Sequence, residues 1–171
     1  MKLIILNGPP GVGKSTIASR LHQELTSSVL INIDELRRTI SNYREHREES
    51  SRRSYELTAD AVVEGFQSGH DVIIDKAISY TDTLDNLVEI GRRHAADVYE
   101  VLLFADKDVV ERRAANRGFK EGGLLTPEKV SELWEKSHSL HIQRSDAVVI
   151  DTTHLDTEQV YVAVRSAIGL D

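Results

Sequence analysis

A glycine-rich segment near the N-terminus, residues 8–15, has the spacing G-x-x-x-x-G-K-S/T. Glycines at these positions let the backbone curl, so that successive N–H groups can point at phosphate oxygens. Lys14 supplies a positive charge for the β- and γ-phosphates, and the hydroxyl of Ser15 is a suitable ligand for Mg²⁺. The segment therefore predicts a P-loop that binds a nucleoside triphosphate together with Mg²⁺.

The sequence on either side of this segment supports the same interpretation. The apolar run 3–6 is typical of a strand that is buried on both faces, and the amphipathic pattern of residues 14–24 is typical of a helix. A helix N-terminus adds its positive dipole end to a phosphate site. The alternative is a glycine-rich turn that carries a surface lysine. The expected nucleotide-binding residues are Gly8, Pro9, Pro10, Gly11, Val12, Gly13, Lys14, Ser15 and Thr16.

Two carboxylates follow runs that we expect to form strands. Asp34 comes directly after the strand expected at 29–33, and Asp75 ends the apolar run 72–74. Because ligands bind at the carboxyl ends of the strands in open α/β sheets, both residues are candidates for the site. A carboxylate is also the hard oxygen ligand that Mg²⁺ prefers. The alternatives are that Asp34 only caps a helix and that Asp75 is a polar strand end facing solvent.

Apolar runs and helical patterns alternate along the whole chain, which predicts an α/β sandwich with a parallel sheet. The highly charged stretch 44–53 has no apolar face and is predicted to be a solvated helix end or a loop. Residues 119–125 include two glycines and are predicted to be a mobile loop. The expected strands are 3–6, 29–33, 72–74, 98–104 and 147–150, and the expected helices are 14–24, 34–43, about 55–66, 84–90, 109–116, one capped by Thr126 and one from Asp156 to Gly169.

Size and composition restrict the class of protein. The chain has 171 residues and we expect one domain over residues 1–171. No stretch approaches the roughly 20 apolar residues of a membrane span, no signal pattern is present, and there are no cysteines. These features predict a cytoplasmic protein with no membrane partner, and they leave monomer and homodimer both open. The net charge of -7 argues against a broad nucleic-acid-binding surface.

Among P-loop proteins, the sequence favours the kinases. A GTPase carries the guanine-reading pattern N/T-K-x-D late in the chain, and the nearest segment, residues 116–119, does not fit it. A large motor ATPase needs a longer chain. The arginine-rich segment 112–117, which follows the fourth expected strand, indicates the small-molecule kinase branch instead.

The sequence resembles the P-loop kinases typified by chloramphenicol phosphotransferase, the 5′-kinase domain of polynucleotide kinases, gluconate kinase and zeta toxins. The order of motifs matches over the whole chain, and the segments 3–8 and 151–154 resemble the opening and closing parts of chloramphenicol phosphotransferase. The resemblance implies a three-layer α/β/α sandwich with a five-stranded parallel sheet in the order 2-3-1-4-5. It also implies a lid at about residues 113–126, and ATP and Mg²⁺ as cofactors.

The resemblance further assigns roles to single residues. It implies that Asp34 takes the proton of the acceptor hydroxyl and that Arg37 binds the acceptor, because the two match the D-x-x-R pattern of polynucleotide kinases. It implies that Asp75 holds Mg²⁺ through water. Lys76 departs from the residues of several relatives, so two roles stay open for it: contact with the acceptor or with the γ-phosphate. The alternative for Arg37 is a solvated side chain.

Two arginines of the expected lid, Arg113 and Arg117, are four residues apart and share a helix face. The resemblance implies that one stacks on adenine and that the other stabilises charge on the transferring phosphoryl group, tasks that suit a guanidinium. The alternative is an exposed basic face, which explains Arg112 equally well. By resemblance Thr153 flanks the adenine, or it simply ends the fifth strand. The expected catalytic residues are Lys14, Asp34, Arg113 and Arg117.

The acceptor cannot be read from the sequence, and three functions stay open. The first is transfer of the γ-phosphoryl group of ATP to a hydroxyl of a small molecule. The second is a polynucleotide 5′-hydroxyl kinase, which the pair Asp34 and Arg37 favours and the acidic balance opposes. The third, from another class, is a nucleotide-binding regulator that does not turn over. A regulator has no need of a base beside the P-loop.

Overall fold

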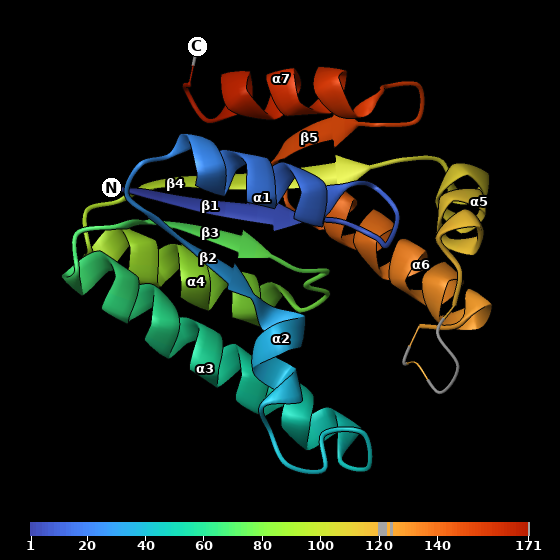
Figure 1. Ribbon diagram of the computed structural model, residues 1–171, viewed down its shortest axis with the longest axis horizontal. Helices are drawn as coiled ribbons and strands as arrows, with labels where there is room; N and C mark the ends of the chain where they lie inside the picture. Colours follow the sequence, from blue (N-terminus) through green and yellow to red (C-terminus); the bar gives the residue numbers. More distant parts are fainter. Residues whose placement is uncertain (120–122, 124, 171) are drawn as a thin grey trace.

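The computed structural model describes residues 1–119, 123 and 125–170, in which five strands and seven helices alternate (Figure 1). The strands are β1 (Lys2–Asn7), β2 (Ser28–Asn32), β3 (Asp71–Asp75), β4 (Asp97–Phe104) and β5 (Val148–Asp151). The helices are α1 (Lys14–Glu24), α2 (Ile33–Arg38), α3 (Arg47–Gln67), α4 (Thr81–Arg93), α5 (Lys107–Arg117), α6 (Pro127–Gln143) and α7 (Thr157–Ala167). Most of the loop predicted at 119–125, and with it part of the predicted lid, lies outside the described residues.

The strands form one parallel sheet in the order β2-β3-β1-β4-β5, which confirms the predicted fold class and strand order. In this order β1 lies at the centre, with β3 on one side and β4 on the other. The last residues of neighbouring strands therefore meet at one edge of the sheet. Asp75 is in register with both Asn32 on β2 and Leu6 on β1.

The alternating side chains of β1 belong to two separate cores, one on each face of the sheet. Ile4 and Leu6 pack in the core that α1 and α7 cover, whereas Leu3 and Ile5 pack in the core that α3 and α4 cover (Figure 1). A strand buried on both faces reads as a continuous apolar run, as predicted for residues 3–6. The described helices include none that combines the length and the apolar composition of a membrane span.

The second helix is shorter than predicted and has a different cap. The predicted helix 34–43, capped by Asp34, is instead α2, which begins at Ile33 and ends at Arg38. Asn32 is its N-cap, because its side-chain oxygen accepts a hydrogen bond from the backbone N–H of Glu35 at 3.1 Å. The capping interpretation of Asp34 is therefore wrong, and the carboxylate of Asp34 is free of that task.

The charged stretch 44–53 forms the start of α3, which begins at Arg47 rather than near residue 55 as predicted. The buried face of this first half is made of Ser50, Ser54 and Thr58, which are spaced by four residues and at most 2% exposed. Their hydroxyls bond to backbone carbonyls, and Ser54, for example, donates to Ser51 at 2.7 Å. Small hydroxyl side chains replace an apolar stripe, so hydrophobic periodicity gave no signal.

Candidate active site

The glycine-rich segment 8–15 connects β1 to α1 at the carboxyl edge of the sheet (Figure 1). Gly8 has a φ of +139°, and a Cβ at this position would lie 2.0 Å from the carbonyl oxygen of Leu103 on β4. Gly13 is the N-cap of α1 in a left-handed conformation, and α1 has no side-chain cap. The N-terminus of α1 thus has the geometry of a phosphate site, where a ligand completes the first turn.

Lys14 is the first residue of α1, and its ammonium group donates a hydrogen bond to the carbonyl oxygen of Pro9 at 2.8 Å. Burial lowers the pKa of Lys14 to about 8. The carboxylates of Asp75 and Asp34 oppose this shift, whereas the positive charge of Lys76 adds to it. These four charged side chains therefore lie within electrostatic reach of one another. A bound triphosphate would supply the negative charge that stabilises the protonated lysine.

Asp75 is the last residue of β3 and is only 6% exposed. Its negative charge raises the pKa of Lys14, so it lies near the P-loop. The side-chain amide of Asn32 donates to Asp75 at 3.3 Å, which holds one carboxylate oxygen. Mg²⁺ in phosphoryl-transfer sites usually takes only one or two protein oxygens, and phosphates and water supply the rest. A hydroxyl from Ser15 and a carboxylate from Asp75 fit that pattern. No cluster of three His, Cys, Asp or Glu side chains able to hold a metal occurs in the described part of the chain.

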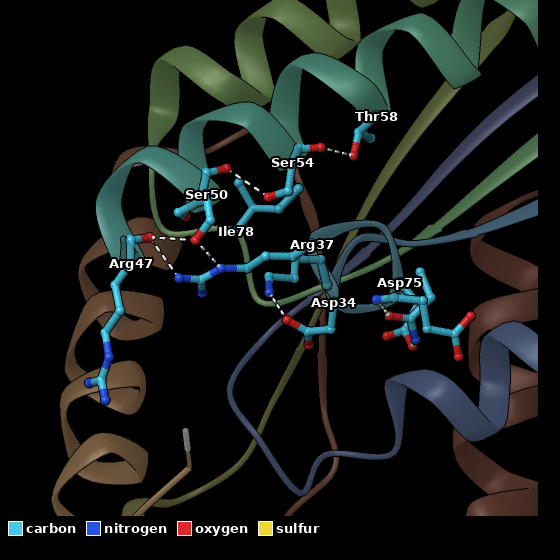
Figure 2. Close-up of polar contacts among 12 residues, drawn as sticks. Asp34, Arg37, Arg47, Ser50, Ser54, Thr58, Asp75 and Ile78 are labelled. Atoms are coloured by element: carbon cyan, nitrogen blue, oxygen red, sulfur yellow. Dashed lines mark hydrogen bonds and ion pairs between the residues drawn. The ribbon is translucent and has the colours of Figure 1, made fainter. Parts of the chain in front are cut away.

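Asp34 and Lys76 form an ion pair across the ends of β2 and β3 (Figure 2). The carboxylate of Asp34 remains 57% exposed, while the side chain of Lys76 is only 15% exposed. Asp34 is thus open to a molecule that approaches from solvent. Its negative charge also raises the pKa of the P-loop lysine, Lys14. Asp34, the expected base, and Lys76, whose role the sequence left open between the acceptor and the γ-phosphate, are therefore in direct contact.

Arg37 holds the connection between α2 and α3. Its Nε donates to the hydroxyl of Ser50 at 3.0 Å, and its Nη2 donates to the carbonyl oxygen of Arg47 at 2.6 Å (Figure 2). Ser50 in turn donates to the carbonyl oxygen of Tyr43 at 2.9 Å. These contacts give Arg37 a structural task that the D-x-x-R pattern did not predict, and its role in acceptor binding stays a prediction.

The two predicted lid arginines lie in different surroundings on α5. Arg113 is half-buried and donates two hydrogen bonds to Thr152, at 3.1 Å to the hydroxyl and at 2.8 Å to the carbonyl oxygen. Its Cβ also lies 3.2 Å from where a Cβ on Gly11 would be, so α5 packs against the P-loop. Arg117 is exposed at the end of α5, and its charge contributes to the lowered pKa of Lys14. Of the two arginines, Arg117 is therefore the one whose positive charge lowers the pKa of Lys14 in the P-loop.

Thr153 lies in the connection between β5 and α7, beside the residue that Arg113 holds. Its hydroxyl accepts a hydrogen bond from the backbone N–H of Asp106 at 3.0 Å, and its own N–H donates to Asp151 at 2.8 Å. Hydrogen bonds from Thr153 lower the pKa of Asp151. Thr153 therefore fixes this connection, and its predicted place beside an adenine stays a prediction.

Sequence reasoning missed Asn7, which joins the P-loop to the segment after β3. Its side-chain oxygen accepts from the N–H groups of Gly8 and Ile78, both at 2.8 Å. Its amide donates to the carbonyl oxygen of Ile78 at 3.0 Å. Asn7 is 1% exposed, and the signal was available: a polar residue ends an otherwise apolar strand immediately before the first glycine.

Two further residues support the site. Asn32 carried no distinguishing signal in the sequence, and Thr152 was pointed to only as part of the segment 151–154 that resembles chloramphenicol phosphotransferase. Asn32 caps α2 and holds Asp75, and Thr152 receives Arg113. The contact of Asn32 with Asp75 and that of Thr152 with Arg113 join segments that are distant in the chain. Only the strand order brings such partners together.

Two open hollows lie on either side of the β3–α4 connection. One, of about 260 Å³, is bordered by Tyr55 and Asn86, and the other, of about 200 Å³, by Ser79 and Lys136. Neither is lined by a P-loop residue, so neither is the phosphate site. Tyr80, which is 53% exposed and packs edge-on against Tyr55, lies in the chain between residues that border the two hollows.

Comparison with known structures finds kinases. The tunicamycin resistance protein of Deinococcus radiodurans is 20% identical, with a TM-score of 0.69 and coverage of 100% of this chain and 98% of that one. A gluconokinase from Sinorhizobium meliloti 1021 is 16% identical, with a TM-score of 0.75 and coverage of 98% and 91%. The deoxyadenosine kinase of M. mycoides is 14% identical, with a TM-score of 0.57 and coverage of 99% of both chains. At these identities the likeness shows the fold.

The family comparison agrees with the fold. No curated protein matches the sequence. A family model described as an AAA domain matches residues 3–141, which span β1 to α6 and include the P-loop, Asp34, Asp75 and α5. The resemblance to P-loop kinases is confirmed by this match together with the kinase neighbours. The chain therefore belongs to this AAA domain family and has the fold of a P-loop kinase.

Proposed function

We propose that the protein is an ATP-dependent phosphotransferase that moves the γ-phosphoryl group of ATP to a hydroxyl group of a small molecule. The observation that carries the proposal is the position of Asp34. This exposed carboxylate lies in the first turn of α2, directly after β2, is free of helix capping, and raises the pKa of Lys14 in the P-loop. A nucleotide-binding regulator needs no such group on the acceptor side of the phosphates.

The proposed mechanism assigns one task to each part of the site. The P-loop backbone and Lys14 bind the triphosphate, and Ser15 and Asp75 would hold Mg²⁺, which would neutralise phosphate charge when bound. Asp34 accepts a hydrogen bond from the acceptor hydroxyl, aims its oxygen at the γ-phosphorus and takes its proton. Arg117 stabilises the charge that develops on the transferred group, and Arg113 keeps α5 against the P-loop.

A small-molecule acceptor is favoured over a polynucleotide end. The net charge is -7, which disfavours broad contact with a phosphate backbone. Two donors of Arg37 are already bonded to Ser50 and Arg47. The D-x-x-R pattern keeps the 5′-hydroxyl kinase as a second candidate, because Asp34 and Arg37 occupy its positions. A reaction that consumes ATP also agrees with the expected cytoplasmic location.

The replacement Asp34→Asn tests the proposal. The asparagine keeps the size of the side chain but cannot take up a proton, and because Asn32 rather than Asp34 caps α2, the fold should be retained. We expect nearly unchanged ATP·Mg²⁺ binding in calorimetry, and phosphoryl transfer reduced by roughly 10²-fold or more. Transfer at the wild-type rate would exclude Asp34 as the base.

The assay needs an acceptor, which a screen can supply. Pools of sugar acids, nucleosides, tunicamycin-type compounds and DNA or RNA with free 5′-hydroxyl ends are incubated with ATP labelled in the γ-phosphate. Label transferred to a small molecule supports the proposal, and label found only on polynucleotide ends supports the second candidate. ATP binding without transfer to any pool, and without an effect of Asp34→Asn, would favour the regulator.

A further inference from the structure

The side chain of Lys76 sits on the group proposed as the catalytic base. Its backbone is held in place by hydrogen bonds. The N–H of Lys76 donates to the carbonyl oxygen of Leu6 at 3.3 Å, and two residues further on both the N–H and the carbonyl oxygen of Ile78 bond to the side chain of Asn7. Only the side chain is left to move. In the structure it forms the ion pair with Asp34 (Figure 2).

The exposures of the two partners differ in a way that matters for chemistry. The carboxylate of Asp34 is 57% exposed, so water reaches it, whereas Lys76 is 15% exposed. A carboxylate placed to take a proton from an acceptor hydroxyl can equally take one from water. Water is present at far higher concentration than any acceptor. An unguarded base at this position would therefore hydrolyse ATP wastefully.

We propose that Lys76 determines specificity for the acceptor over water by holding one oxygen of the Asp34 carboxylate, Oδ1, in an ion pair until an acceptor is bound. This inference rests on the proposed phosphotransferase function and adds a residue to it. The side chain of Lys76 lies within electrostatic reach of Lys14, and the two positive charges repel each other. The phosphates that Lys14 would bind attract Lys76. A bound acceptor hydroxyl takes over the hydrogen bond to Asp34, and the ammonium group of Lys76 turns to the transferring phosphoryl oxygens.

The side reaction that Lys76 suppresses is the hydrolysis of ATP. The oxygen of a water molecule forms a bond to the γ-phosphorus, and the bond from that phosphorus to the β–γ bridging oxygen breaks. ADP leaves with the electron pair, and Asp34 takes the proton from the attacking water and releases it to solvent. The products are ADP, inorganic phosphate and a proton. Removal of Lys76 exposes Asp34 to this route without an acceptor.

The test measures ADP release from ATP·Mg²⁺ with no acceptor present, so it does not depend on acceptor identity. Lys76→Met should raise this rate by roughly tenfold, part of the 10²–10⁴-fold that general base catalysis contributes. Lys76→Arg, which keeps a cation beside Asp34, should stay near the wild-type rate. The double variant Asp34→Asn, Lys76→Met should lose the increase, because no base is left. A matched control is Lys107→Met, which removes an ion pair to Glu135 that does not involve Asp34 and should leave the rate unchanged.

Thermal unfolding and calorimetry with ATP·Mg²⁺ accompany each rate, and Lys76→Gln replaces Lys76→Met if the methionine variant does not fold. A rate that stays at or below the wild-type value in a folded, ATP-binding Lys76 variant overturns the inference and leaves the phosphotransferase proposal intact. A double variant that hydrolyses ATP as fast as Lys76→Met overturns both, since Asp34 would not be the base. Absence of ATP binding by the wild-type protein would also overturn both.

Discussion

At the scale of single residues, the site combines a partly buried cation with carboxylates that only partly balance it. Burial lowers the pKa of Lys14 to about 8 from the ordinary value of 10.5, although Asp75 and Asp34 oppose the shift. Near pH 8 a sizeable fraction of the free protein therefore carries a neutral Lys14. The triphosphate favours the protonated form, so nucleotide binding and protonation are linked.

This linkage predicts proton uptake on binding. At about pH 8, where roughly half of Lys14 is neutral, ATP·Mg²⁺ should bind with uptake of about half a proton. The sign follows because the free protein has the lower pKa and the complex the higher one. Calorimetry in two buffers of different ionisation enthalpy measures it. Lys14→Arg, whose guanidinium is always protonated, should abolish the uptake, and identical heats in both buffers for the wild type would contradict the prediction.

Lys14 itself is predicted to be indispensable. Lys14→Ala removes the cation of the P-loop, so ATP·Mg²⁺ should bind weakly and phosphoryl transfer should fall below detection. Calorimetry and the transfer assay check this, with Lys107→Met as a control for the loss of a lysine elsewhere on the protein. Equal affinity and equal turnover in Lys14→Ala would remove the P-loop assignment.

At the scale of secondary-structure elements, the strands could be predicted from the sequence, because runs such as residues 3–6 are apolar and short, whereas their order came from the resemblance to P-loop kinases. The P-loop was predictable too, since its glycines serve a local backbone geometry. Contacts between distant segments were not: the ion pair of Asp34 with Lys76 and the bond of Arg113 to Thr152 both depend on strand order. The start of α3 escaped because its buried stripe of Ser50, Ser54 and Thr58 lacks apolar side chains.

The cap of α2 gives a prediction at this scale. Asn32→Ala removes the hydrogen bond to the N–H of Glu35 and the contact to Asp75, and should lower the free energy of unfolding by about 1 kcal/mol. Chemical denaturation measures the loss. Asp156→Ala, at the capping box of α7, is the comparison, since it should cost a similar amount of stability without lowering transfer. An Asn32→Ala protein with full transfer activity would show that α2 and Asp75 need no such support.

Helix α5 gives a second prediction. Arg117→Ala should lower kcat by on the order of 10³-fold while changing ATP affinity little, because its charge is needed mainly in the transition state. Steady-state kinetics with the identified acceptor separate the two effects. Arg112→Ala is a suitable control, since Arg112 pairs with Asp108 on the exposed face of α5. An unchanged kcat in Arg117→Ala would assign Arg117 to the solvated surface.

At the scale of the whole molecule, the P-loop is held in place by strands on both sides of β1. Gly8 lies against the backbone of β4, and Asn7 bonds to the segment after β3. The proposed phosphate site and the proposed acceptor side therefore share one support at the centre of the sheet. A change at this support should affect stability and activity together.

Gly8→Ala tests that support. The new methyl group would lie 2.0 Å from the carbonyl oxygen of Leu103, so either the P-loop or β4 must move. We expect a loss of about 1–3 kcal/mol from overpacking, in addition to the strain of a positive φ. Gly69→Ala is the control, because Gly69 has a φ of +77° but no atom within 4 Å of the added carbon. Equal losses in both variants would mean that the contact with β4 is unimportant.

The side chain of Asn7 has a practical consequence for spectroscopy. Its NH₂ group is buried and bonded to Ile78, so in an ¹⁵N-labelled protein its two protons should exchange slowly with solvent and give a resolved pair of signals. The oxygen of the same amide receives the first N–H of the P-loop and the N–H of the segment that follows Lys76. One pair of resonances should therefore shift when nucleotide binds and shift again when acceptor binds. A titration followed at this single amide would order the two binding events without any label on either ligand.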